Sequence, residues 1–209
     1  MSCVPNKFFN DTRGVASLEF VVVIPILFIL LIGIYQLTEF VRVNARVSRV
    51  AVAVADLVTQ QSSGITGGSS GSLGNFCVGA RLMMTPFPAT SSAFTLAIAS
   101  VTNYSGSGGT SVVVNDWEVD TACSGSTAPH LGSAAAIALA TTPVNFDLVP
   151  TPGPVGSTGI AGDSVIVVEV NYQYSSLIQY LAPSLGTITK LGFARPRANA
   201  VIACTASCT

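Results

Sequence analysis

The sequence is poor in charged side chains and has almost no histidine. Charged residues make up 9% of its 209 residues, with nine Lys and Arg against ten Asp and Glu, one His and a formal net charge of −1. An average soluble domain carries about 25% charged residues. Without a large basic patch, the chain lacks the electrostatic footprint of a nucleic-acid-binding protein. So few carboxylates and a single histidine also leave little material for acid–base catalysis or a metal centre, so we expect no enzyme and no cofactor.

Apolar residues are abundant instead, and many of them form one uninterrupted run. They account for 49% of the chain, which excludes an intrinsically disordered protein. No charge interrupts the segment from Phe20 to Thr38, FVVVIPILFILLIGIYQLT. As a helix this segment spans about 28 Å, close to the bilayer's hydrocarbon thickness of about 30 Å. We therefore predict one transmembrane helix with the lipid bilayer as its partner. A cleavable secretory signal fits less well, because three arginines separate the run from the small residues that a signal peptidase requires.

Four of the five cysteines follow the apolar run and are disulfide candidates. They are Cys77, Cys123, Cys204 and Cys208. An even number of cysteines in a Gly- and Ser-rich chain is typical of an oxidising compartment, and the three ways of pairing them stay open. The basic residues near the two ends of the run would, by their number, favour the opposite orientation. From the cysteines we predict a cytoplasmic N-terminus and an exported C-terminal domain.

An apolar stripe continues beyond the run. Its residues recur every three or four positions, which predicts that the helix covers residues 15–61 and is about 70 Å long. The stripe consists of Phe40, Val43, Val47, Val50, Val54 and Leu57. Such a seam is equally suited to packing against the chain's own domain and to packing against the same helix of a second subunit.

Beyond the helix, residues 62–75 are rich in Gly and Ser and predict a linker, and residues 76–209 alternate apolar segments with turn signals. The expected strands are 94–101, 111–119, 165–174, 187–193 and 198–203, and the expected short helices are 77–84 and 130–140. In the clearest strand, Glu169, Asn171 and Gln173 alternate with apolar residues, so we expect it to be half buried. An antiparallel sheet of about four strands beside short helices is an α+β domain.

Three acidic residues alternate along one of these strands. We expect Asp116, Glu118 and Asp120 to share one face of the sheet while Trp117 and Val119 point inward. They are weak candidates for a calcium site, because calcium binds six or more oxygen ligands. A solvated sheet face is the expected arrangement, with no metal and no small-molecule substrate.

One carboxylate directly precedes the apolar run. Glu19 stands five residues after Gly14. Cleavage after Gly14 would create an α-amino group on Val15, one helical turn from Glu19 and able to pair with its carboxylate in the same or a neighbouring subunit. Alternatively, Glu19 is an acidic residue near the helix N-terminus that is favoured by the helix macrodipole and needs no partner.

The segment RGVASLEF at 13–20, followed by VIPIL at 23–27, resembles the N-terminus of TadE-like proteins, the pilin-like components of bacterial tight-adherence (Tad) pilus systems. ADLVTQ at 55–60 is similar to the helix end of these proteins. The resemblance extends over 13–61, and beyond it the likeness is one of pattern only. It implies a pilin-like architecture, in which a long N-terminal helix precedes a small exported domain.

The resemblance also implies a function. Residues 1–14 would be a cytoplasmic leader, cut between Gly14 and Val15 by a prepilin peptidase, and Glu19 would be the carboxylate that pairs subunits. The chain would be a minor pilin or pseudopilin that is held in the bacterial inner membrane, has a periplasmic C-terminal domain, and assembles with other pilin subunits into an extracellular pilus. The major pilin of these systems is far shorter. The alternative is a permanently membrane-tethered periplasmic domain that binds a ligand or assists assembly.

Overall fold

A computed structural model of the chain describes residues 12–62, 64–67, 71–90, 92–109, 111–120, 148–154, 156, 158–175, 186–197 and 201–206. The chain divides into two compact units, Met1–Arg42 and Val43–Thr209. The elements are α1 (Thr12–Thr59), β1 (Ile65–Thr66), α2 (Ser72–Met83), β2 (Phe94–Ser105), the short 3₁₀-helix η2 (Ser107–Gly109), β3 (Ser111–Asp120), β4 (Ala161–Gln173), β5 (Thr187–Ala194) and β6 (Cys204–Ala206). A long apolar N-terminal helix followed by an antiparallel sheet and a short helix confirms the α+β class.

Helix α1 runs without interruption for 48 residues and contains Pro25. Proline removes one backbone donor, which membrane helices tolerate. Within the described residues, α1 is the helix that is long and apolar enough to cross a membrane. It ends at Thr59, where the Gln61 amide donates to the Val58 carbonyl at 3.1 Å and Gly64 follows with a φ of 83°. The prediction that the helix continues beyond the apolar run is therefore confirmed.

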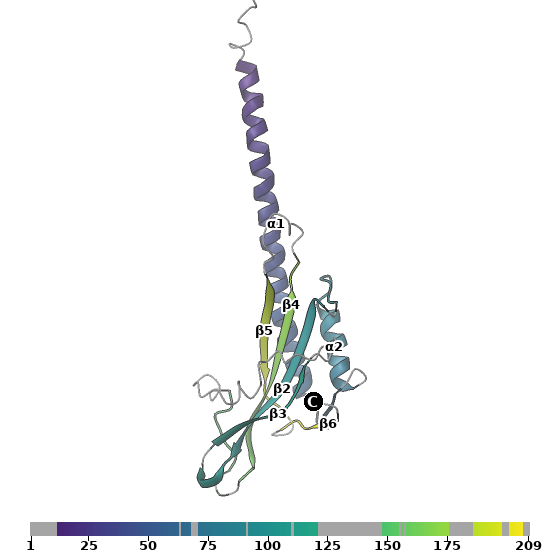
Figure 1. Cartoon of the computed structure of the whole chain (residues 1–209), viewed down its shortest axis with the longest axis vertical. Coiled ribbons are helices and arrows are strands. Elements are labelled where there is room, and N and C mark those ends of the chain that lie inside the picture. The colour runs from purple at the N-terminus through teal and green to yellow at the C-terminus, as the bar shows by residue number, and fades with distance from the viewer. Residues whose placement is uncertain are drawn as a thin grey trace, which may run out of the picture. The chain divides into compact units, whose positions relative to one another are not determined.

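Four strands form one sheet in the order β3-β2-β4-β5, and every neighbouring pair is antiparallel. Strands β2 and β4 are central and long, with 12 and 13 residues (Figure 1). The turn between β2 and β3 contains Gly108 with a φ of 73°, a conformation that glycine adopts without strain. Four of the predicted strands are present, each longer than or equal to its expected length.

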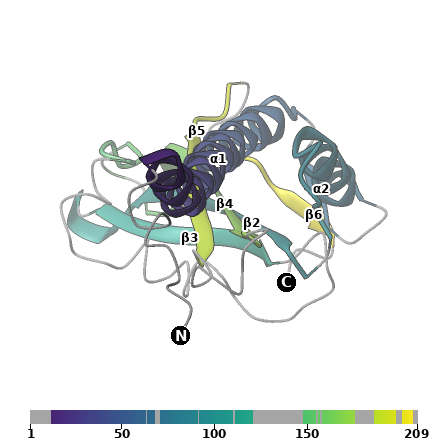
Figure 2. The same cartoon turned by 90° about the horizontal axis from the view of Figure 1, so that it is seen from above.

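One face of this sheet packs against the second part of α1. Gly192 of β5 comes so close to the helix that a methyl group added there would lie 2.4 Å from the Ala51 carbonyl oxygen. Val168 is the partner of Gly192 across the strand pair and is fully buried. The part of α1 from Val43 onward and the strands belong to one compact unit (Figure 2). Glycine in β5 therefore permits the close approach of helix and sheet.

The other face of the sheet carries its own apolar cluster. Its members come from β2, β3, β4 and the segment before β4: Ala97, Ala99, Val101, Val113, Val149, Val165 and Val167. Strand β4 is thus covered on both faces from Ser164 to Val170, and even Glu169 is only 9% exposed. The expectation of a half-buried strand was wrong for this part, because a second apolar layer covers the face that alternation assigned to solvent.

Residues 62–75 are not simply a linker. Ile65 is buried in β1, which pairs in parallel with β6 in a separate two-stranded sheet. Thr66 and Ser72 exchange hydrogen bonds, with the Thr66 amide donating to Ser72 Oγ at 2.9 Å and the Ser72 amide donating to Thr66 Oγ1 at 3.0 Å. These bonds satisfy an amide at the start of α2, which begins at Ser72 rather than at Cys77.

The C-terminal strand also differs from the prediction. We expected 198–203 to complete the antiparallel sheet, but residues 201–203 form no strand and β6 begins at Cys204. Strand β6 lies beside α2 in both views (Figures 1 and 2). The buried Trp117 indole donates to the Ile202 carbonyl at 2.7 Å, which holds this segment outside the main sheet. The helix expected at 130–140 lies outside the described residues.

Candidate functional site

The residues of the predicted processing and pairing site lie at the start of α1. Gly14 and Val15 belong to its first turn, and Glu19 follows in the second turn with an exposed side chain. A separation of four residues puts positions 15 and 19 on one face of the helix. The pairing between an α-amino group on Val15 and the Glu19 carboxylate stays a prediction.

The segment after Glu19 presents apolar side chains on all sides. Ile24 is partly exposed, and the other large apolar side chains of the segment are between 44% and 71% exposed. They are Phe20, Val21, Val22, Val23, Ile26, Leu27, Phe28, Ile29, Leu30, Leu31, Ile32, Ile34, Tyr35 and Leu37. A helix that is apolar all round is typical of a membrane span or of the core of an assembly. This surface is far too large to be an ordinary patch on a soluble monomer.

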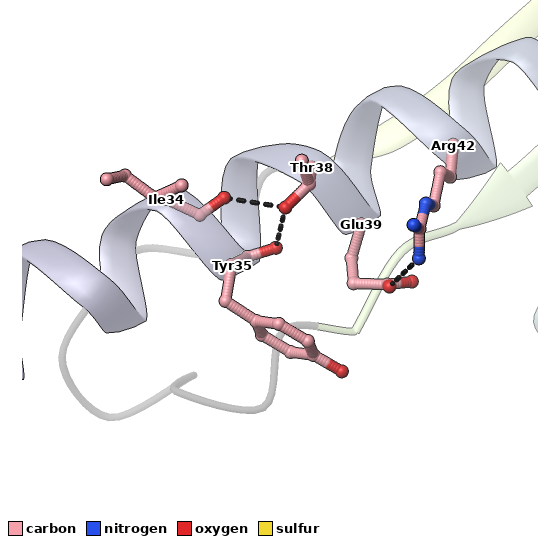
Figure 3. Close-up of polar contacts among 5 residues, drawn as sticks. All are labelled: Ile34, Tyr35, Thr38, Glu39 and Arg42. Carbon is pink, nitrogen blue, oxygen red and sulfur yellow. Dashed lines mark hydrogen bonds and ion pairs between the residues drawn. The ribbon is translucent and has the colours of Figure 1, made fainter.

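Polar groups at the end of this segment are paired within the helix (Figure 3). The Thr38 hydroxyl donates to the Ile34 carbonyl at 2.7 Å and to the Tyr35 carbonyl at 2.8 Å, so it is satisfied without water. One residue later, Glu39 forms an ion pair with Arg42 at 2.9 Å. These contacts were not predicted from the sequence, although spacings of three and four residues in a helix could have indicated them.

Most of the predicted packing stripe is buried inside the chain's own fold. Val43, Val47, Val50 and Val54 are at most 1% exposed, whereas Phe40 and Leu57 are partly exposed. Ala51, Ala55 and Val58 are also buried, which widens the stripe into the face that packs on the sheet. The four valines are therefore used within the domain and are not available to a helix of a second subunit.

The three acidic residues of β3 do not share a face. A β-bulge follows Ser100, because Trp117 pairs with Ser100 and Asn115 with Val101, and this leaves Asp116 as the extra residue. The Asp116 carboxylate faces the hydroxyls of Ser100 and Thr102, while Glu118 pairs with Ala99 of the opposite face. The expected alternation was wrong because a bulge shifts the register by one residue.

The described part of β3 contributes to no metal-binding group, and its apolar residues Trp117 and Val119 are buried. Among the described residues no group of three or more His, Cys, Asp or Glu side chains could hold a metal ion. The side chain of Asp120 lies outside the described part. Trp117 and Val119 are both 8% exposed, as predicted.

Asp116 instead organises a small polar cluster. Thr102 Oγ1 donates to Asp116 Oδ2, and Tyr104 Oη donates to Asp116 Oδ1 at 2.6 Å. Burial and the hydrogen bond to the carboxylate raise the pKa of Tyr104 to about 12. Because Tyr104 stays protonated, it remains a hydrogen-bond donor to Asp116. The hydrogen bonds of this cluster join β2 to β3.

Two of the four disulfide candidates lie in the described part. Cys77 of α2 and Cys204 of β6 are both disulfide-bonded. Cys77 is buried at 2% exposure. Cys123 and Cys208 lie outside the described residues, so the pairing stays open.

No family model, no curated protein and no solved structure matches this chain. Inferences about function therefore rest on the residues and their geometry.

Proposed function

We propose that the chain is a non-enzymatic, pilin-like subunit that α1 anchors in a bacterial inner membrane and that takes part in the assembly of a Tad-type pilus. The observation that carries the proposal is the division of α1. Its segment from Phe20 to Leu37 exposes apolar side chains, and its segment from Val43 to Val58 buries them against a sheet. Exposed apolar area costs about 25 cal/mol per Å² in water, so the first segment requires lipid or the helices of other subunits around it.

The disulfides support an exported C-terminal domain. Cys77 and Cys204 are bonded, and such bonds persist in the periplasm but not in a reducing cytoplasm. In this topology residues 1–14 are the cytoplasmic leader and the domain after α1 is periplasmic. The charge-free segment and the ion pair at its end suit a helix that leaves the bilayer near Glu39.

The subunit contact is expected on the membrane segment. The valines of the stripe are buried inside the domain, so self-association has to use the exposed residues of α1 before Val43. Glu19 is the carboxylate at the N-terminal edge of this surface, and Glu39 lies at the opposite edge. In the proposed mechanism, a prepilin peptidase cuts between Gly14 and Val15, and the new α-amino group pairs with Glu19 of the same or a neighbouring subunit.

The intact mass and N-terminal sequence of the chain from its native membrane test this mechanism. We expect the chain to begin at Val15. We also expect Glu19→Ala to deplete the subunit from sheared surface filaments and to leave it in the membrane fraction. Glu39→Ala is the matched control, because it removes a carboxylate from the same helix but lies beyond the apolar segment. Equal incorporation of both variants would refute the pairing role of Glu19.

The second candidate is a permanently tethered periplasmic domain that binds a ligand or assists assembly. It is favoured by a shallow depression of about 210 Å³ lined by Leu148, Val165, Phe193, Ala194 and Arg195. A chain that retains Met1–Gly14, together with unchanged filaments in Glu19→Ala, would support this second function over the first.

A further inference from the structure

A second cleft, of about 370 Å³, opens on the sheet face that carries the apolar cluster of Val165 and Val167. It is lined by Ser92, Ala93, Thr95, Asn171, Gln173 and Thr187. The register explains why these residues meet, because Thr95 pairs with Asn171 and Gln173 pairs with Thr187. The cleft lies where β2 and β5 begin and β4 ends. Its volume lies in the lower part of the range of ligand sites, roughly 300–1,000 Å³.

Asn171 is held in one orientation at the wall of this cleft. Its Nδ2 donates to Glu169 Oε1 at 2.6 Å, and its Oδ1 accepts a hydrogen bond from the Thr189 hydroxyl. Glu169 is only 9% exposed, so the acceptor behind Asn171 is itself fixed. An amide nitrogen carries two hydrogens, and the second remains for a ligand. Polar groups that are held in place before binding are typical of recognition sites.

The other described residues that line the cleft carry no charge, and all of them except Ala93 are polar. Three lining hydroxyls and two lining amides supply both donors and acceptors, and the Ser92 hydroxyl is within 3.3 Å of the Thr90 hydroxyl. None of the six lining residues is charged, aromatic or a large aliphatic residue. A charged ligand would lose water without gaining a counter-charge, and an apolar ligand would leave the polar groups without partners.

We propose that this cleft binds a neutral saccharide. Sugar hydroxyls both donate and accept hydrogen bonds, and the walls offer the same mixture. An extended peptide fits less well, because it would need apolar pockets for its side chains, which these six residues do not form. None of the described lining residues offers an aromatic platform for the sugar ring, so affinity depends on the hydrogen bonds, and Asn171 is the central donor. This binding is independent of the membrane anchor and of pilus assembly.

The test is saturation-transfer NMR on the full-length chain in detergent, with maltose, lactose and di-N-acetylchitobiose as probes. We expect at least one of these neutral disaccharides to bind, and Asn171→Ala to weaken that binding about tenfold, as the loss of one well-placed hydrogen bond does. Gln173→Ala, at an exposed position, provides a second variant that leaves the sheet core untouched. Asn75→Ala is the matched control, because it also removes a side-chain amide but does so on the exposed surface of α2. This variant should bind the disaccharide as the wild type does.

Three results would overturn the proposal. These are the absence of binding by all three disaccharides, unchanged binding in both cleft variants, and equal binding of sialyllactose, whose charge the cleft should reject. Competition by an uncharged extended peptide at the same residues would assign the cleft to peptide recognition instead.

Discussion

Tyr104 and Asp116 show how a single position departs from the pattern of its strand. Asp116 is the bulged residue of β3, and its carboxylate accepts hydrogen bonds from hydroxyls of β2. The alternation of acidic residues in the sequence is regular, so nothing local to β3 indicates the bulge. Its cause is the pairing with a partner strand that offers Thr102 and Tyr104 as donors. Long-range pairing of this kind is not visible in local periodicity.

This cluster predicts a dependence of stability on pH. The pKa of Tyr104 is about 12 in the folded chain, above the ordinary tyrosine value of 10.0, so the unfolded chain loses this proton at lower pH. The free energy of unfolding should therefore fall as pH rises from 10 to 12, and the contribution of Tyr104 is complete below pH 10. Denaturant unfolding across this range should show a shallower fall for Tyr104→Phe. Parallel curves for the two proteins would contradict the role of this tyrosine.

Substitution by alanine should have opposite effects on the free energy of unfolding at Gly192 and at Gly79. A methyl group at Gly192 would meet the Ala51 carbonyl oxygen at 2.4 Å and the Val52 amide nitrogen at 2.8 Å, both in the backbone of α1. Gly192→Ala should lower the free energy of unfolding by about 1–3 kcal/mol. Gly79 of α2 has open space around it, so Gly79→Ala should raise the free energy by about 0.5–1 kcal/mol. Thermal unfolding of both variants measures this, and a neutral Gly192→Ala would contradict the close packing of helix and sheet.

At the scale of elements, the first part of α1 exposes its apolar side chains, and the part from Val43 onward buries one face against the sheet. The spacing of apolar residues predicted the stripe but left two partners open, a sheet or a second helix. Burial of Val43, Val47, Val50 and Val54 assigns the stripe to the chain's own sheet. The spacing of a stripe shows only which side of the helix is apolar. The element that packs against this side depends on residues far away in the sequence.

A pair of valines in α1 tests this assignment. Val50 is 1% exposed and Val52 is 47% exposed, so Val50→Ala removes buried side-chain atoms while Val52→Ala gives the same gain in helix propensity without that loss. We expect Val50→Ala to lower the free energy of unfolding of the domain by about 2 kcal/mol, from lost burial and the cavity left behind. Val52→Ala should change it by less than about 0.5 kcal/mol. Similar unfolding midpoints for the two variants would show that the stripe is not a core element.

The strand expected at 198–203 was wrong for a related reason. Apolar residues near the C-terminus resemble a further strand of the sheet, yet β6 forms at Cys204–Ala206 and pairs with β1 instead. Ile65 lies buried opposite Cys204 in this small sheet. The partner of a strand depends on which sheet edge is free and on which contacts hold the strand near that edge. Here these contacts are the hydrogen bond from Trp117 to Ile202 and the disulfide of Cys204.

At the scale of the whole molecule, the chain consists of two units that differ in how far their apolar side chains are exposed. The unit Met1–Arg42 exposes apolar side chains, and the unit Val43–Thr209 buries them on both faces of a sheet. This contrast supports a membrane anchor followed by a folded domain that is stable outside the bilayer.

A charge placed in the anchor tests this view of the whole chain. Leu30 is 61% exposed in the middle of the apolar segment, so Leu30→Lys would put an ammonium group near the centre of the bilayer. The cost of insertion is about 3 kcal/mol. We expect alkaline carbonate extraction to release a larger share of Leu30→Lys than of the wild type, with Leu30→Ala as the control. Equal retention of all three proteins would argue against a membrane-spanning role.

Local sequence alone is enough to predict the long helix, its charge-free first segment, the apolar stripe that continues it, and four antiparallel strands. Each of these depends on periodicity or composition over neighbouring residues, which a single segment carries in full. Only the tertiary structure decided that the stripe packs on the sheet, that Asp116 bulges away from Glu118, that β6 joins β1, and that Asn171 is fixed at a polar cleft. Each of these depends on which distant segments meet, because burial and hydrogen bonding are completed by partners elsewhere in the chain.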